Sequence, residues 1–182
     1  MNAGIGKPVL RSEDDRLLRG EGCFTDDLTF PNMAYAFVVR SPHAAAQILE
    51  INDEQALRAK GVLGVYSAKS IAGELGEIPC FGGHKRSDGS PMFIPSHPVL
   101  AKERTVFVGE AVALVVAKNL SDARMAAELV EVDYQPSQAV TDVSRAVEPG
   151  APVVWPDCSD NISFCFSVGD NRSVEQAFAK AD

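Results

Sequence analysis

One stretch, from Val106 to Tyr134, constrains the fold more than any other part of the chain, because it predicts a strand, a helix and a second strand in succession. Residues 106–108 and 111–117 form a nearly continuous apolar run, which is typical of a strand covered on both faces. Gly109 interrupts the run and predicts a bulge or a close backbone approach. The stretch therefore predicts a mixed α and β fold built around this unit.

The middle of the same stretch predicts a helix with Ser121 as its N-cap. Small apolar residues recur there at helical spacing and predict a flat face that lies on a sheet: Ala123, Ala126, Ala127 and Val130. The period then changes to two through Tyr134, which predicts a half-buried strand. Pro136 makes continuation of that strand unfavourable.

The preceding residues predict three more strands and a short helix. The strands are expected over residues 34–40, 46–51 and 62–68, and the helix over residues 53–60 with Gly61 as its stop. Residues 1–17 are polar and predict an irregular lead-in. Residues 74–98 have no period and exceed ordinary loop length, which indicates a functional or interaction segment.

After Tyr134 the chain predicts a second irregular connector, over residues 135–161. A strand is expected over residues 162–168, and a helix from Val174 onward with Ser173 as its cap. That helix meets no stop signal before Asp182, so we expect the chain to be a fragment cut inside a following domain.

Composition restricts the class of partner. The formal net charge of −8 argues against nucleic acid and anionic membranes, since both are bound through clustered Lys and Arg. No apolar segment approaches the roughly 20 residues of a membrane helix, and the N-terminus lacks the apolar core of a secretory signal. The four cysteines are widely spaced and are expected to be free thiols. Together these features predict a cytoplasmic protein.

Residue types that carry chemistry are present without a complete motif. Cys80, His84 and His97 share one loop but lack the fourth ligand of a zinc site, and no nucleophile motif occurs. Adjacent carboxylates such as Asp26 and Asp27 favour a capping role over catalysis. Glu110 interrupts an apolar strand and is either a charge exposed by a bulge or a buried acid with a partner. The sequence thus predicts no catalytic, cofactor-binding or metal-binding residue in this chain.

Two functional classes remain from these residues alone. The chain is either a structural domain of a larger enzyme or a stand-alone protein-interaction module whose contact surface is the loop of residues 74–98.

Four separated stretches resemble one family when they are read together: GEGCFTDDLTFPNMAYAFVVRSPHAAAQI (20–48), HPVLAKERTVFVGEAVALVVAKNLSDARMAAELVEVDYQP (97–136), GAPVVWPDCSDN (150–161) and GDNRSVEQAFAKAD (169–182). They are similar, in order and spacing, to the opening of the large subunit of xanthine dehydrogenase and aldehyde oxidase-type molybdenum hydroxylases. Carbon-monoxide dehydrogenase large subunits belong to the same group. Ala111 departs from the Pro that many members have after the glycine and glutamate.

The resemblance implies an α+β fold class. Residues 18–137 would form an α/β-hammerhead domain, and residues 138–182 a connector and the truncated start of the first molybdopterin-binding domain. It also implies an oxidoreductase that hydroxylates aldehydes or N-heterocycles such as purines, or oxidises carbon monoxide. The active-site residues of that family lie downstream, so this segment alone is predicted to be inactive.

The resemblance further implies the cofactors and partners of the whole protein. A molybdenum–pyranopterin centre would belong to the full-length protein, with iron–sulfur clusters and FAD in partner domains or subunits of an oligomer. The four cysteines do not match iron–sulfur spacing. In this reading the hammerhead domain is a wall that packs on the downstream molybdopterin-binding domains and helps to close the substrate funnel.

The residues predicted to face that funnel or a neighbouring subunit lie at strand ends. They are Ser41, Pro42, His43, Gly109 and Glu110, together with the loop of residues 74–98.

Overall fold

A computed structural model of the chain describes residues 6, 8 and 11–181. It divides into two units, Met1–Met33 and Ala34–Asp182. Within the described residues, no helix is both long and apolar enough to cross a membrane.

The first unit contains two short helices, α1 (Asp14–Leu18) and η1 (Thr25–Asp27). An irregular lead-in was predicted over residues 1–17, and this prediction was wrong where α1 forms a helix. This helix has acidic residues in its first turn, and an ion pair four residues apart joins Asp15 to Arg19 at 2.8 Å. Such pairs add a few tenths of a kcal/mol, about 0.2–0.5, to an exposed helix.

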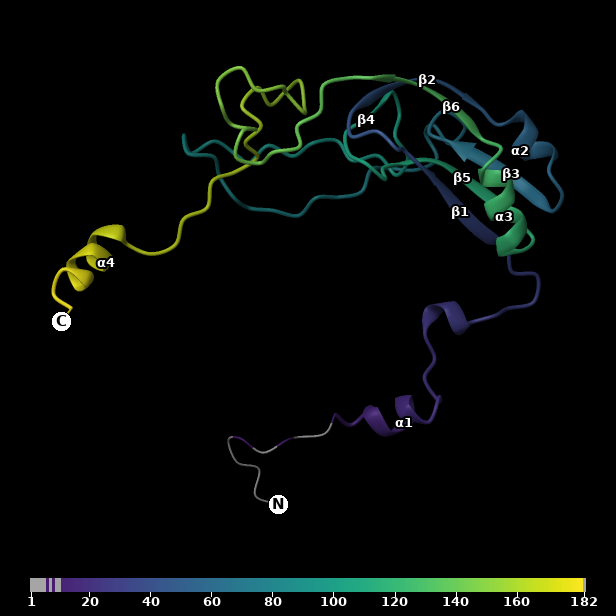
Figure 1. Ribbon diagram of the computed structural model, residues 1–182, viewed down its shortest axis with the longest axis horizontal. Helices are drawn as coiled ribbons and strands as arrows, with labels where there is room; N and C mark the ends of the chain where they lie inside the picture. Colours follow the sequence, from purple (N-terminus) through teal and green to yellow (C-terminus); the bar gives the residue numbers. More distant parts are fainter. Residues whose placement is uncertain (1–5, 7, 9–10, 182) are drawn as a thin grey trace. The chain divides into compact units, whose positions relative to one another are not determined.

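The second unit is built on two three-stranded sheets in which every strand pair is antiparallel (Figure 1). One sheet has the order β1 (Tyr35–Arg40), β5 (Ala111–Ala117) and β3 (Val62–Ser67). The other has the order β4 (Arg104–Thr105), β2 (Ala46–Asn52) and β6 (Glu131–Pro136).

Two helices supply the rest of the core, α2 (Glu54–Arg58) and α3 (Leu120–Ala127). The core residues are small, so helix and sheet can approach closely: Ala56, Val65, Ala113, Val115, Ala126, Ala127 and Val130. Phe37 and Val39 from β1 pack against this cluster, which ties the edge strand to α3.

Strand β5 is central to its sheet, as its apolar run predicts. Ala113 and Val115 are fully buried in the core. Leu114 and Val116, which alternate with them, are only half buried among the described residues. Val112 on that second face is fully buried, so the predicted burial is complete on one face and partial on the other.

The start of the central unit differs from its prediction. Residues 106–108 form a turn rather than a strand, and the short strand β4 precedes them. Gly109 has φ of +86°, a conformation that favours glycine and that ends the turn before β5.

Helix α3 (Leu120–Ala127) begins two residues earlier than predicted. Its N-cap is Asn119, whose Oδ1 accepts a hydrogen bond from Asp122 N at 2.8 Å. The prediction of Ser121 as the cap was wrong because asparagine fulfils the role first. Gly61 stands as predicted where the chain leaves α2, with φ of +79°.

The last third of the chain holds less regular structure than predicted. The strand expected over residues 162–168 is reduced to one bridging residue, Cys165. Helix α4 (Asn171–Phe178) is present, but its cap is Asp170 rather than Ser173. Asp170 accepts from Arg172 N at 3.0 Å and from the Ser173 hydroxyl, so Ser173 lies inside the first turn.

Candidate functional site

Ser41 lies directly after β1 and is almost completely buried, with 2% of its surface exposed. Its Oγ accepts a hydrogen bond from His43 N at 3.1 Å and lies 3.2 Å from Thr105 Oγ1. The hydroxyl thus joins the end of β1 to β4 and bends the chain at the exposed Pro42.

Glu110 is buried too, with 8% exposed, and its Oε2 accepts a hydrogen bond from Val106 N at 2.6 Å. Of the two alternatives that the sequence leaves open for Glu110, the structure has the buried acid with a partner. That partner is a backbone amide, and the bond closes the turn of residues 106–109.

Backbone hydrogen bonds connect Ser41 to the same turn. Ser41 N donates to Glu110 O at 2.9 Å, and Gly109 N donates to Ser41 O at 2.8 Å. The Arg40 guanidinium also donates to Gly109 O, at 2.7 Å. Three of the five predicted site residues therefore meet in one hydrogen-bonded network, which we call the Ser41–Glu110 network.

The network presents an apolar turn to the outside. Phe107 and Val108, at its tip, are 47% and 64% exposed. The sequence analysis did not select these two residues, although an apolar pair before a glycine at a strand end is a usable signal. The Glu110 carboxylate and the Ser41 hydroxyl are both hydrogen bonded within the network. The network therefore positions the turn and does not act as an acid or a base.

The remaining predicted residues, Pro42 and His43, lie on the outer side of the bend. The His43 ring packs edge-on against Tyr134, with ring centroids 5.0 Å apart. Burial raises the pKa of the Tyr134 phenol, so the tyrosine stays protonated and neutral near neutral pH.

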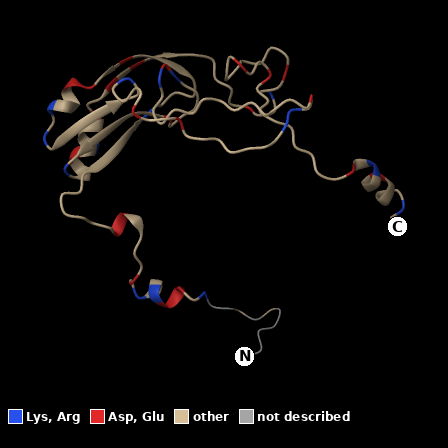
Figure 2. Cartoon of the chain, turned by 180° about the vertical axis from the view of Figure 1, so that it is seen from behind, with Lys and Arg blue, Asp and Glu red and all other residues tan. Residues whose placement is uncertain are grey.

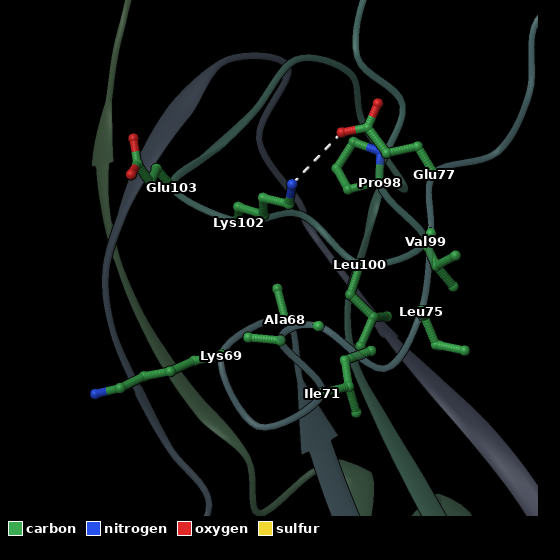
Figure 3. A pocket seen from close by; sticks show the side chains of 13 residues that line it. Ala68, Lys69, Ile71, Leu75, Glu77, Pro98, Val99, Leu100, Lys102 and Glu103 are labelled. Carbon is green, nitrogen blue, oxygen red and sulfur yellow. Dashed lines mark hydrogen bonds and ion pairs between the residues drawn. The ribbon is translucent and has the colours of Figure 1, made fainter.

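A pocket of about 500 Å³ lies between the chain after β3 and the chain before β4 (Figure 3). Its floor is apolar and includes Ala68, Ile71, Leu75 and Leu100. At its rim the Lys102 ammonium pairs with Glu77 at 3.4 Å, and Ser96 Oγ donates to Glu77 at 2.6 Å. The Ser96 hydrogen bond, more than the Lys102 charge, lowers the pKa of the Glu77 carboxyl.

The long loop of residues 74–98 contacts the C-terminal connector. Phe93 N donates to Ser163 O at 2.9 Å, and Cys165 N donates to Lys85 O at 3.0 Å. The Arg86 side chain donates to Asp160 and to Ile162 O. Sequence reasoning missed this pairing, since residues about 75 positions apart carry no local signal of contact.

The ligand types noted in the loop remain apart. His84 stacks on Phe164 with ring centroids 4.6 Å apart. Over residues 11–181, no three His, Cys, Asp or Glu side chains converge as a metal site would require. Cys23, Cys80, Cys158 and Cys165 are all free thiols, and Cys158 alone is buried.

Figure 2 shows how charge is distributed over the described chain. Lys and Arg are scattered among Asp and Glu along a mostly uncharged chain, and this view contains no basic stripe.

Residues 19–138 match the family model described as aldehyde oxidase and xanthine dehydrogenase, a/b hammerhead domain. The chain is 33% identical over 192 aligned positions to the carbon monoxide dehydrogenase large chain of Afipia carboxidovorans. It is 31% identical to a probable xanthine dehydrogenase subunit of Bacillus subtilis. Each alignment covers 98% of this chain and 22% of the relative.

Solved structures agree with the sequence relatives. CO dehydrogenase from Oligotropha carboxidovorans matches with a TM-score of 0.74 and 33% identity, over 98% of this chain and 22% of that one. The aldehyde oxidoreductase of Desulfovibrio gigas matches with a TM-score of 0.70 and 27% identity, over 85% and 17%. The α/β-hammerhead fold predicted from the sequence is confirmed. This chain spans about a fifth of the length of these relatives.

Proposed function

The chain belongs to the aldehyde oxidase and xanthine dehydrogenase family, and from that premise we propose that it is the hammerhead segment of a molybdenum hydroxylase large subunit. The whole protein would oxidise a small substrate of the kinds its relatives are named for, such as carbon monoxide, a purine or an aldehyde. The match over nearly the full chain to large subunits of several such enzymes is the observation that carries this proposal.

We propose that the segment itself forms a wall of the substrate funnel and supplies no catalytic residue. The Ser41–Glu110 network supports this role, because it uses its polar groups internally and holds an apolar turn outward. Pro42, His43 and the turn of residues 106–109 are the proposed funnel or interface surface. An apolar, rigid wall excludes water from a reaction centre.

The molybdenum–pyranopterin centre would be held by residues outside this chain. The donor set here does not fit it: the thiols are dispersed, and the three buried polar side chains beside the turn of residues 106–109, which are Ser41, Thr105 and Glu110, are already hydrogen bonded. The dispersed thiols also do not fit an iron–sulfur cluster. Such clusters and FAD are therefore assigned to partner domains or subunits, in an oligomer that we place in the cytoplasm.

The proposal is tested on the full-length large subunit, expressed from the native reading frame with its partner subunits. We expect about one molybdenum per large subunit and oxidation of an aldehyde, an N-heterocycle or carbon monoxide with an artificial electron acceptor. Full-length protein that is folded, yet binds no molybdenum and oxidises none of the three classes, would favour the stand-alone interaction module.

A further inference from the structure

Strand β1 lies at an edge of its sheet, because β5 is the only strand it pairs with among the described residues. The direction of the β5 backbone groups follows from one hydrogen bond. Lys118 N donates to Gly61 O at 2.9 Å, on the β3 side of β5. Since backbone groups alternate in direction along a strand, those of Ala117 and Val115 point to the other side, toward β1.

The register of β1 against β5 then gives the direction in which each backbone group of β1 points. Tyr35 lies opposite Ala117 and Phe37 lies opposite Val115, so these two residues bond to β5. The backbone groups of Ala36 and Val38 point the opposite way. They have no backbone hydrogen-bond partner within the part of the chain that the structure describes.

Each of the other sheet edges is either very short or blocked at one position. Ser137 N donates to Ala45 O on the β2 side, so the neighbouring Pro136 faces outward from β6, where it has no N–H to offer. Strand β4 has two residues only. On β3, Ser67 N is already bonded to Ser70 Oγ at 2.8 Å. Proteins block edges in these ways, and β1 has no such block among the described residues.

The open edge runs beside a hollow with both apolar and charged side chains. A groove of about 550 Å³ is lined by residues 36–40 of β1, by Arg124 and Ala127 of α3, and by Glu128 directly after that helix. In Figure 2 the strands of this sheet are drawn almost entirely in tan, so charge is scarce along them.

We infer that β1 accepts a further strand, supplied by a part of the large subunit outside residues 1–182. An extended segment is the occupant that matches a row of unpaired N–H and C=O groups, with apolar side chains at alternate positions. The chain covers only 22% of its carbon monoxide dehydrogenase relative, so ample large subunit remains to supply it. This inference rests on the proposed function, because it takes the large subunit as the source.

A second copy of this chain fits the edge less well. Pairing of β1 with itself would involve six residues from each copy. A stable interface between proteins buries at least about 1,000 Å², which a single pair of short strands does not reach. A segment of the same subunit needs no such area because it is covalently linked.

The test is amide hydrogen exchange at single-residue resolution on the full-length large subunit in its complex. We expect the amides of Ala36 and Val38 to exchange on the order of 100-fold more slowly than unstructured amides, as those of Tyr35 and Phe37 do. Exchange of Ala36 and Val38 at the rate of unstructured amides, beside protected Tyr35 and Phe37, would overturn the inference.

A dilution series separates the two sources. Protection that persists in a monomeric large subunit supports the same-subunit strand, whereas protection lost on dissociation assigns the edge to another chain of the complex and refutes it. Molybdenum content is measured on the same samples. A molybdenum-loaded subunit with a fast-exchanging edge refutes only the inference, and a protected edge without molybdenum refutes only the proposed function.

A substitution provides a second test. Val38→Pro removes an N–H that the β1–β5 ladder does not use, whereas Val38→Ala keeps it and serves as the matched control. We expect the Ala36 amide to exchange at least about ten-fold faster in V38P than in V38A. Equal rates in two folded variants would contradict an added strand, and an unfolded V38P leaves the wild-type exchange measurement decisive.

Discussion

The carboxylate of Glu110 accepts a hydrogen bond from the backbone amide of Val106 at 2.6 Å, so a buried acid closes a four-residue turn from inside. The backbone of Glu110 simultaneously accepts from Ser41 N. One residue thereby determines the position of the exposed Phe107 and Val108 relative to the end of β1.

Removal of the Glu110 carboxylate should destabilise the domain. Glu110→Ala leaves the Val106 amide without its acceptor, which costs about 1–3 kcal/mol. Glu110→Gln retains an acceptor oxygen and should cost less. Urea unfolding monitored by circular dichroism measures both, with Glu128→Ala on the exposed side of α3 as the control. Equal stability of E110A and E128A would mean that the hydrogen bond contributes nothing.

Gly61→Ala should be poorly tolerated for two separable reasons. A Cβ at Gly61 would lie 2.1 Å from Asp122 Oδ2, and the φ of +79° disfavours any L side chain. The conformation alone costs about 1–2 kcal/mol, and the clash adds to it. Gly73→Ala is the matched control, since its φ is +84° but its Cβ would meet nothing within 4 Å.

Thermal unfolding of G61A and G73A separates the cost of the backbone conformation from the cost of the clash with Asp122. G61A should melt at a lower temperature than G73A, and a further Asp122→Ala substitution should recover part of the difference. If G61A and G73A melt together, the Asp122 side chain moves aside without cost.

The Glu77 carboxyl should titrate below its ordinary value of 4.5, chiefly because Ser96 donates a hydrogen bond to it. A lowered pKa means that the charged form is favoured in the folded state. The associated stability is present above the ordinary pKa and is lost as pH falls through the folded pKa. Carboxyl-detected NMR titration of wild-type protein and Ser96→Ala should show the midpoint move upward in S96A.

Lys102→Ala provides the comparison for Glu77. Its hydrogen bond and its charge each rank below the Ser96 bond among the influences that lower this pKa, and K102A should also move the midpoint upward. A larger shift in K102A would make the ion pair, rather than the hydroxyl, the principal cause.

Local patterns predicted the regular elements of the second unit well. The alternation over β1 and the small-residue face of α3 correspond to burial in the core, because period and burial have the same physical origin. Asn119, rather than Ser121, is the N-cap of α3. Both residue types cap helices well, so the sequence alone does not decide between two nearby candidates.

Such local patterns do not predict contacts between residues that are far apart in the sequence. Arg86 reaches Asp160 and Ile162 across more than seventy residues, and nothing near Arg86 indicates this partner. Ser41 and Glu110 were both selected for their strand-end positions, but their hydrogen-bonded connection depends on the β1–β5 register. The family resemblance identified the fold, whereas the partner of each polar side chain required coordinates.

The unblocked edge of β1 has a consequence for biosynthesis. Relatives of this chain are more than four times longer, so a strand from a later part of the large subunit would be made well after residues 35–40. At about 5–20 residues per second, the edge would wait for on the order of a minute before a distant strand is made. Neighbouring nascent chains on one polysome present the same edge during that interval. Pairing between these open edges during that interval would lower the yield of correctly assembled protein.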